Sequence, residues 1–163
     1  MKRIINKVAV LGSGIMGSRI ACHFANKGVQ VLLLDIVPRE LGDADKAKGL
    51  RLEDKAVRNS IVNGSLQSAL KSNPSPIFDK KFASRISTGN FEDDMPKIKD
   101  CDWVIEVVVE RLDIKKIIFD QVEKFRKPGT LVSSNTSGIP IHLMNEGRSD
   151  DFKKHFCGTH FFN

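Results

Sequence analysis

The sequence predicts an α/β fold in which a doubly wound, mostly parallel sheet carries helices on both faces. Strand-like apolar runs alternate with helix-like amphipathic segments along all 163 residues. A glycine turn at residues 12–17 directly follows the first run. A near-continuous apolar run at 103–109 has the composition of a parallel strand buried on both faces. A chain of this length buries about 70% of its unfolded surface, so we treat residues 1–163 as one domain.

The first structural unit runs from Lys7 to Asp35. Val8 to Leu11 is an apolar strand, and residues 12–17 (Gly-Ser-Gly-Ile-Met-Gly) fit the pattern G-x-G-x-x-G. A helical segment follows, and the next apolar run ends in the aspartate. A lone G-x-G-x-x-G arises by chance in many glycine-containing loops. The order of strand, glycine turn, helix, strand and acid is instead typical of a Rossmann dinucleotide-binding unit.

Each residue type in the turn has a physical task. Gly12 permits the tight turn out of the strand, Gly14 lets the backbone approach a pyrophosphate, and Gly17 lets the helix pack close to the sheet. The first peptides of the helix, at Ile15 and Met16, offer their N–H groups to the phosphates. The turn therefore predicts a site for a dinucleotide cofactor.

Asp35 decides between two such cofactors. Its carboxylate would accept hydrogen bonds from the ribose hydroxyls of the adenosine half. Two like charges about 4 Å apart cost roughly 4 kcal/mol at an effective dielectric constant of about 20, so the carboxylate disfavours the 2′-phosphate of NADP. The sequence therefore predicts NAD.

The excess of basic residues admits three kinds of partner. The chain has 26 Lys and Arg against 20 Asp and Glu, which gives a formal charge of +6. Nucleic acid, a membrane surface or an anionic small molecule would each fit this charge. The basic residues are mixed with acids and no nucleic-acid-binding motif accompanies them, so we expect no nucleic-acid partner. A multiply phosphorylated ligand explains the excess equally well.

The cysteines and the first residues indicate the cellular compartment in which the protein resides. Cys22, Cys101 and Cys157 are widely spaced and form no C-x-x-C pair, so we expect reduced thiols in a cytoplasmic protein and no metal site. Lys7 and the glycine turn interrupt the first apolar run. We therefore expect neither a signal peptide nor a membrane-spanning helix.

A helical excursion at about 38–82 separates the second strand from the third. Apolar residues spaced by three or four from Pro38 onward predict one long amphipathic helix that ends at Asn63-Gly64. The following segment, broken by Asn-Pro-Ser-Pro at 73–76, predicts one or two short helices up to Phe82. Such an excursion is longer than a crossover requires. It could form a wall of the substrate site, and an inert decoration fits the pattern as well.

The second half of the sequence alternates between strands and helices in the same way. Strands are expected at 85–88, 103–109, 131–134 and 156–162, and helices at 112–126 and 140–146. Ligands of such sheets bind beyond the carboxyl ends of the strands. The glycine turn, the residues after Val109, the turn at 135–137 and the end of the last strand should therefore surround one crevice.

Glu106 is unexpected inside the apolar run at 103–109. A buried carboxylate must be paired or hydrogen-bonded. It either faces a ligand cleft at the end of the strand or satisfies backbone groups, with the second use slightly favoured.

Four motifs in this order resemble a known family. They are Gly12 to Gly17, Glu106 with Val109-Glu110-Arg111-Leu112 and Lys115, Ser134-Asn135-Thr136-Ser137, and Gly158-Thr159-His160-Phe161-Phe162-Asn163. Together they resemble the NAD-binding domain of the 3-hydroxyacyl-CoA dehydrogenases over nearly the whole chain. Other 3-hydroxyacid dehydrogenases share the glycine turn but not Ser-Asn-Thr-Ser followed by His-Phe-Phe-Asn, so they rank second.

The resemblance implies three catalytic residues. His160 matches the histidine that takes the proton of the 3-hydroxyl while a hydride leaves C3 for NAD; positioned acid–base catalysis of this kind is worth about 10²–10⁴-fold. Ser137 matches the serine that hydrogen-bonds the reacting oxygen, and Asn163 matches the asparagine beside substrate and nicotinamide. Without the resemblance, His160 would more often be a satisfied core histidine and Ser137 a turn residue.

The resemblance also extends the cofactor site. Glu110 and Lys115 match residues near the nicotinamide ribose, and Asn135 is assigned to the cofactor with them. The implied substrate is a 3-hydroxyacyl-CoA of fatty-acid metabolism, as in β-oxidation. The coenzyme A contacts of the excursion are not assigned.

One feature departs from the family. There, the glutamate that orients the histidine and a second, helical domain both follow His-Phe-Phe-Asn, whereas this sequence ends at Asn163. We therefore expect a truncated dehydrogenase that binds NAD with little or no turnover. The face meant for the second domain should be apolar and favour self-association, so a homo-oligomer is expected. The competing hypothesis is a non-catalytic dinucleotide-binding module, which has no need for Ser137, His160 and Asn163 together.

Overall fold

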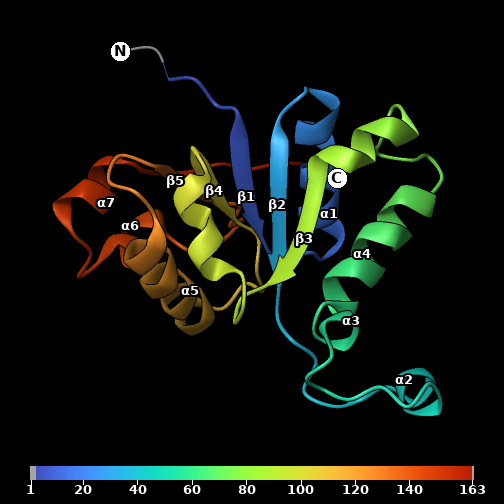
Figure 1. Ribbon diagram of the computed structural model, residues 1–163. Coiled ribbons are helices and arrows are strands. Elements are labelled where there is room, and N and C mark those ends of the chain that lie inside the picture. Colours follow the sequence, from blue (N-terminus) through green and yellow to red (C-terminus); the bar gives the residue numbers. More distant parts are fainter. Residues whose placement is uncertain (1–2, 163) are drawn as a thin grey trace.

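The computed structural model describes residues 3–162 and contains a six-stranded sheet (Figure 1). Its strands are β1 (Lys7–Leu11), β2 (Gln30–Asp35), β3 (Ile86–Asn90), β4 (Trp103–Glu106), β5 (Leu131–Ser134) and β6 (Phe156–Gly158). They lie in the order β3-β2-β1-β4-β5-β6, and every pair of neighbours is parallel. The doubly wound parallel fold expected from the sequence is thereby confirmed.

Helices cover both faces of this sheet. The main ones are α1 (Ile15–Asn26) and α4 (Ser60–Lys71) on one face, and α5 (Leu112–Phe125), α6 (Ile141–Asn145) and α7 (Asp150–Lys154) on the other (Figure 1). Two 3-10 helices, η1 (Lys80–Arg85) and η2 (Met95–Asp100), precede β3 and β4.

The core is divided between these two faces because side chains alternate along a strand. In β1, Val8 and Val10 pack with apolar residues of α1 and α4, while Ala9 and Leu11 pack with those of α5. These four side chains of β1 are fully buried. The first strand therefore carries no polar group along its buried length, as its apolar run predicts.

The chain order reverses at β1. Val8 pairs with Val31 of β2 on one side and with Trp103 of β4 on the other. The connections that leave β1 and β4 therefore diverge to opposite faces, which opens a crevice beyond the carboxyl ends of these two strands.

The single helix expected at 38–63 is wrong. The segment forms α2 (Asp43–Ala47), α3 (Lys55–Arg58) and α4, and α2 projects away from the sheet (Figure 1). Gly49 has a φ of +69°, and the N–H groups of Gly49 and Leu50 bond back to the carbonyls of Lys46 and Asp45. These bonds end α2 with a left-handed residue.

Gly64, taken from the sequence as a stop signal, lies inside α4. Leu41 and Leu50, which carry the apolar spacing before α3, are only partly buried and belong to neither core cluster, so the pattern does not maintain one long helix there.

Two strands are shorter than expected. β4 ends at Glu106 because the Glu106 side chain accepts a hydrogen bond from the N–H of Val108, which turns the chain out of the sheet. β6 ends at Gly158, although the N–H of Thr159 still reaches the carbonyl of Ser134. Both deviations lie at the carboxyl edge, so the residues of the candidate site stand on loops.

Candidate functional site

The glycine turn is shaped by close packing at two of its three glycines. A Cβ on Gly12, which has a φ of +105°, would lie 2.6 Å from the carbonyl oxygen of Val107. A Cβ on Gly17 would lie 1.8 Å from the carbonyl oxygen of Gly12. A Cβ on Gly14 would meet no atom within 4 Å, so that peptide faces open space. The turn fits the pyrophosphate of a dinucleotide, since its backbone stays accessible at Gly14.

A cavity of about 650 Å³ opens beside this turn. It is lined by Ser13, Gly14, Ile15, Ser18 and Arg19 on one side, and by Gly64, Ser65, Ser68, Ala69 and Ser72 on the other. Helix α4 therefore forms a wall of this cavity beside the glycine turn. Whether the excursion also borders the substrate stays a prediction. Met16 lies behind the turn, in a smaller cavity with Phe161 and Phe162.

Asp35 is held by the turn itself. Its Oδ2 accepts hydrogen bonds from the N–H of Ser13 at 2.6 Å and from the Ser13 hydroxyl at 2.5 Å. Its Oδ1 accepts from the N–H of Ile36 at 2.7 Å. Within residues 3–162 no lysine or arginine pairs with this carboxylate, so its charge faces the crevice without compensation from a cation. Ser13 was not singled out from the sequence because it occupies a variable position of the glycine motif.

On the other side of the switch point lies a buried ion pair. Glu106 and Lys115 are 0% and 1% exposed, and Lys115 Nζ donates to Glu106 Oε1 at 2.7 Å. The hydroxyl of Ser134 donates to the other oxygen of Glu106. Burying two charges is favourable only with such complete pairing. Of the two uses considered for Glu106, the structure shows the second, because the buried carboxylate satisfies the backbone N–H of Val108.

Glu110 connects this pair to the turn that follows β5. Its Oε2 lies 3.2 Å from Lys115 Nζ. Its Oε1 accepts from the N–H groups of Ser137 and Gly138, each at 3.0 Å, and from the Thr136 hydroxyl. Partial burial raises the pKa of this carboxyl, but the hydrogen bonds and Lys115 outweigh burial and lower the pKa to about 2. Glu110 therefore holds the turn as an anion.

His160 and Ser137 line one cavity of about 330 Å³, formed by residues 136–141 and 158–160. His160 is exposed, and its Nδ1 lies 3.3 Å from the carbonyl oxygen of Thr136. Asn135 Oδ1 accepts a hydrogen bond from the N–H of Phe161, which ties the last segment to the end of β5. The structure thus brings Ser137, His160 and Asn135 together, whereas Asn163 lies outside the described residues.

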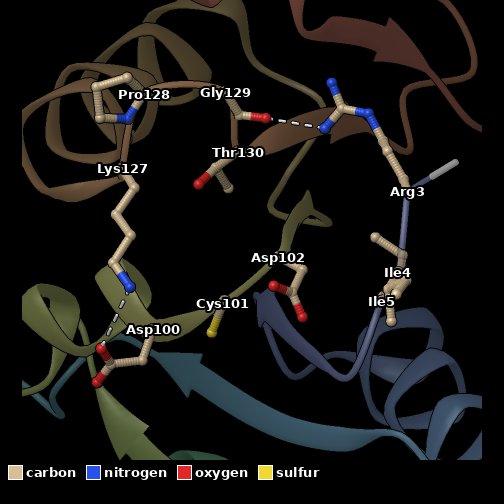
Figure 2. Close-up of a pocket in the computed structure, with 10 residues that line it drawn as sticks. All are labelled: Arg3, Ile4, Ile5, Asp100, Cys101, Asp102, Lys127, Pro128, Gly129 and Thr130. Carbon is tan, nitrogen blue, oxygen red and sulfur yellow. Dashed lines mark hydrogen bonds and ion pairs between the residues drawn. The ribbon is translucent and has the colours of Figure 1, made fainter. Parts of the chain in front are cut away.

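A different cavity lies at the opposite edge of the sheet, at the amino ends of the strands (Figure 2). It has a volume of about 250 Å³. Arg3 there donates to the carbonyl of Gly129 at 2.8 Å, and the Asp102 carboxylate accepts from the N–H groups of Asn6 and Lys7. These bonds close the amino-terminal edge, so this cavity is separate from the crevice.

Within residues 3–162, no cluster of three or more His, Cys, Asp or Glu side chains is arranged to hold a metal ion. No helix in the same part of the chain is long and apolar enough to cross a membrane.

A family model described as the 3-hydroxyacyl-CoA dehydrogenase, NAD binding domain, matches residues 7–163. The chain belongs to this family. A probable 3-hydroxyacyl-CoA dehydrogenase of Bacillus subtilis is 54% identical over all 163 residues, which are 21% of that protein. One from Deinococcus radiodurans is 46% identical over 159 residues, which are 98% of this chain and 42% of that protein. The chain thus spans less than half the length of these relatives.

A solved structure of another protein supports the same family. The (S)-3-hydroxybutyryl-CoA dehydrogenase of Ralstonia eutropha aligns over 98% of this chain and 50% of its own, with a TM-score of 0.66 and 28% identity. The 3-hydroxyacyl-CoA dehydrogenase resemblance, the fold and the NAD cofactor inferred from the sequence are confirmed. The roles of the individual site residues stay predictions.

Proposed function

We propose that this NAD-binding domain serves a dehydrogenase that interconverts a 3-hydroxyacyl-CoA and a 3-oxoacyl-CoA in fatty-acid metabolism. The observation that carries the proposal is the shared cavity of Ser137 and His160, which lies across the switch point from Asp35. A dinucleotide that spans the crevice with its adenosine half at Asp35 has its nicotinamide half on the β4 and β5 side. The nicotinamide half then lies on the same side of the crevice as His160, which can act as an acid–base group.

In this proposal the residues of the chain bind, orient and move a proton. The peptides of the glycine turn bind the pyrophosphate, and Asp35 binds the adenosine ribose. NAD, when bound, supplies the carbon that takes or returns the hydride. Glu110 and Lys115 are assigned to the ribose next to that carbon, together with Asn135.

His160 acts as the base that receives the 3-hydroxyl proton. Its Nδ1 faces the carbonyl oxygen of Thr136, which favours the tautomer with the proton on Nδ1 and leaves Nε2 free to accept. Ser137 donates a hydrogen bond to the reacting oxygen from the turn that Glu110 holds. Asn163 keeps the role beside the substrate that the resemblance gives it.

The first test concerns the cofactor. Titration with NADH and with NADPH, followed by the fluorescence of Trp103, the one tryptophan, should show saturable NADH binding and much weaker NADPH binding. In Asp35→Ala the preference should disappear, because the charge that rejects the 2′-phosphate is removed. Asp43→Ala, on the projecting α2, is the control and should behave as wild type. Equal affinity for the two nucleotides in wild type would contradict the role of Asp35.

The second prediction concerns turnover. We expect the 163-residue chain to bind NADH and to show little or no steady-state oxidation of NADH with acetoacetyl-CoA. Within residues 3–162 no carboxylate contacts the His160 ring, so no negative charge there stabilises the imidazolium that forms. Appreciable turnover by the isolated chain would overturn this expectation.

We further propose a cytoplasmic, homo-oligomeric protein. Cys22, Cys101 and Cys157 are free thiols, which suits a reducing compartment. Burial raises the pKa of Cys22 and of Cys101 to about 11, so both thiols stay protonated at neutral pH. Phe78 and Phe162 are exposed and line one cavity, and they support an association surface there.

A further inference from the structure

Glu106 has no assigned role in the reaction, yet it stands at the centre of the site. It is the last residue of β4, beside Leu11 of β1 and Ser134 of β5 in the strand register. Its side chain is fully buried. A carboxylate in this position either stays fully hydrogen-bonded or destabilises the fold.

The oxygens of Glu106 hold three separate segments of the reaction side. Oε1 accepts from Lys115 Nζ and from the N–H of Val108, both at 2.7 Å. Oε2 accepts from the hydroxyl of Ser134. The main-chain carbonyl of Glu106 accepts from the N–H of Asn135 at 2.8 Å. One residue therefore holds the loop after β4, the first turns of α5 and the start of the turn after β5.

Lys115 passes this constraint to Glu110. Its ammonium group lies between the two carboxylates, 2.7 Å from Glu106 and 3.2 Å from Glu110. The second oxygen of Glu110 in turn binds the N–H of Ser137. Because Lys115 is 1% exposed, its ammonium cannot exchange a lost partner for water without rearrangement. Loss of the Glu106 charge would therefore displace Lys115, and Glu110 and the Ser137 turn with it.

The adenosine side of the crevice has its own support. Asp35 is held by Ser13 and by the N–H of Ile36, and neither bond involves Glu106, Lys115 or Glu110. A disturbance that starts at Glu106 should therefore leave the adenosine half of the site intact.

We propose that Glu106 is a positioning residue for the nicotinamide half of the site, where it fixes Lys115 and, through Glu110, sets the turn that carries Ser137. This inference rests on the proposed function, because it assumes that NAD lies across the crevice. It assigns Glu106 no contact with substrate or cofactor.

The test compares two ligands in the variant Glu106→Gln, which keeps the shape of the side chain but removes its charge. Calorimetric titration with NADH reports both halves of the site, and titration with ADP reports the adenosine half alone. We expect NADH to bind about 2- to 30-fold more weakly than in wild type, with ADP affinity unchanged. Glu146→Gln, which neutralises an exposed carboxylate paired with Lys116, is the matched control and should change neither affinity.

The other outcomes overturn the inference. A general structural role would weaken NADH and ADP alike, and an inert Glu106 would weaken neither. If Glu106→Gln shows no cooperative melt, Glu106→Asp decides, since it keeps the buried charge but shortens the side chain and so draws the carboxylate away from Lys115 Nζ. A loss confined to NADH supports the positioning role, and an equal loss or no loss contradicts it. Wild type that binds neither ligand would instead refute the proposed function.

Discussion

At the scale of single residues, the acids of the crevice are held by hydrogen-bond donors from distant parts of the chain. Asp35 is bound by Ser13, and Glu110 by Thr136, Ser137 and Gly138. The place of Asp35 at the end of a strand could be read from the sequence, because a local order of elements defines it. The partners of Glu110 could not, because its bonds to a turn 26 to 28 residues away leave no local pattern.

Glu110 should make stability depend on pH. Its pKa is about 2 in the folded chain against an ordinary value of 4.5, because hydrogen bonds and Lys115 outweigh the effect of burial. The folded pKa is the lower one, so this contribution is present above about pH 4.5 and is lost as the pH falls toward 2. Glu110→Gln removes the titrating group. The difference in free energy of unfolding between wild type and Glu110→Gln should therefore shrink through this range.

Urea unfolding at a series of pH values measures this difference. Glu146→Gln serves as the control, since its carboxylate only pairs with Lys116 at the surface. A gap between wild type and Glu110→Gln that stays constant from neutral pH down to pH 3 would show that the carboxylate does not hold the turn as an anion.

At the scale of elements, the six strands and helices such as α5 were predictable, whereas the excursion and the short helix α7 were not. A helix such as α5 has an apolar stripe that packs on the sheet, and its predicted span at 112–126 differs from Leu112–Phe125 by one residue. The segment before α3 has similar spacing, but α2 projects away from the sheet (Figure 1). Apolar periodicity predicts a helix only where a surface receives the stripe.

Two glycines of the excursion should respond oppositely to alanine. Neither would bring a new Cβ within 4 Å of another atom, but Gly64 lies inside α4 whereas Gly49 has a φ of +69°. Gly64→Ala should therefore raise the free energy of unfolding by about 0.5–1 kcal/mol. Gly49→Ala should lower it by about 1 kcal/mol, because alanine is strained in the left-handed region. Thermal melts of both variants measure the two changes in stability. A destabilised Gly64→Ala would contradict the helical assignment of Gly64.

At the scale of the whole molecule, an aromatic patch formed by Phe78, Phe161 and Phe162 remains open to solvent. Phe78 and Phe162 are 80% and 87% exposed, and all three residues line one cavity beside α1. An apolar surface of this kind promotes association. The resemblance predicted an apolar face, but its position depends on how segments far apart in the sequence pack together.

We expect this patch to mediate self-association. Sedimentation velocity should show a mass that rises with protein concentration, and Phe78→Ser should shift the distribution toward the monomer. Ile4→Ser is the matched control, because Ile4 is 71% exposed but lies at the amino-terminal edge of the sheet. A single monomeric species at high concentration would count against the patch as an interface.

The parallel register of β1 and β4 has a consequence for how the chain forms its cofactor site during folding. Val8 lies beside Trp103, so the ribosome must deliver the first 103 residues before the central pair can form. Contacts of such long sequence range close a large loop and form late and slowly. The complete crevice, with both halves of the cofactor site, arises only with this pairing. Added NAD should slow the unfolding of the finished domain and leave its refolding rate unchanged.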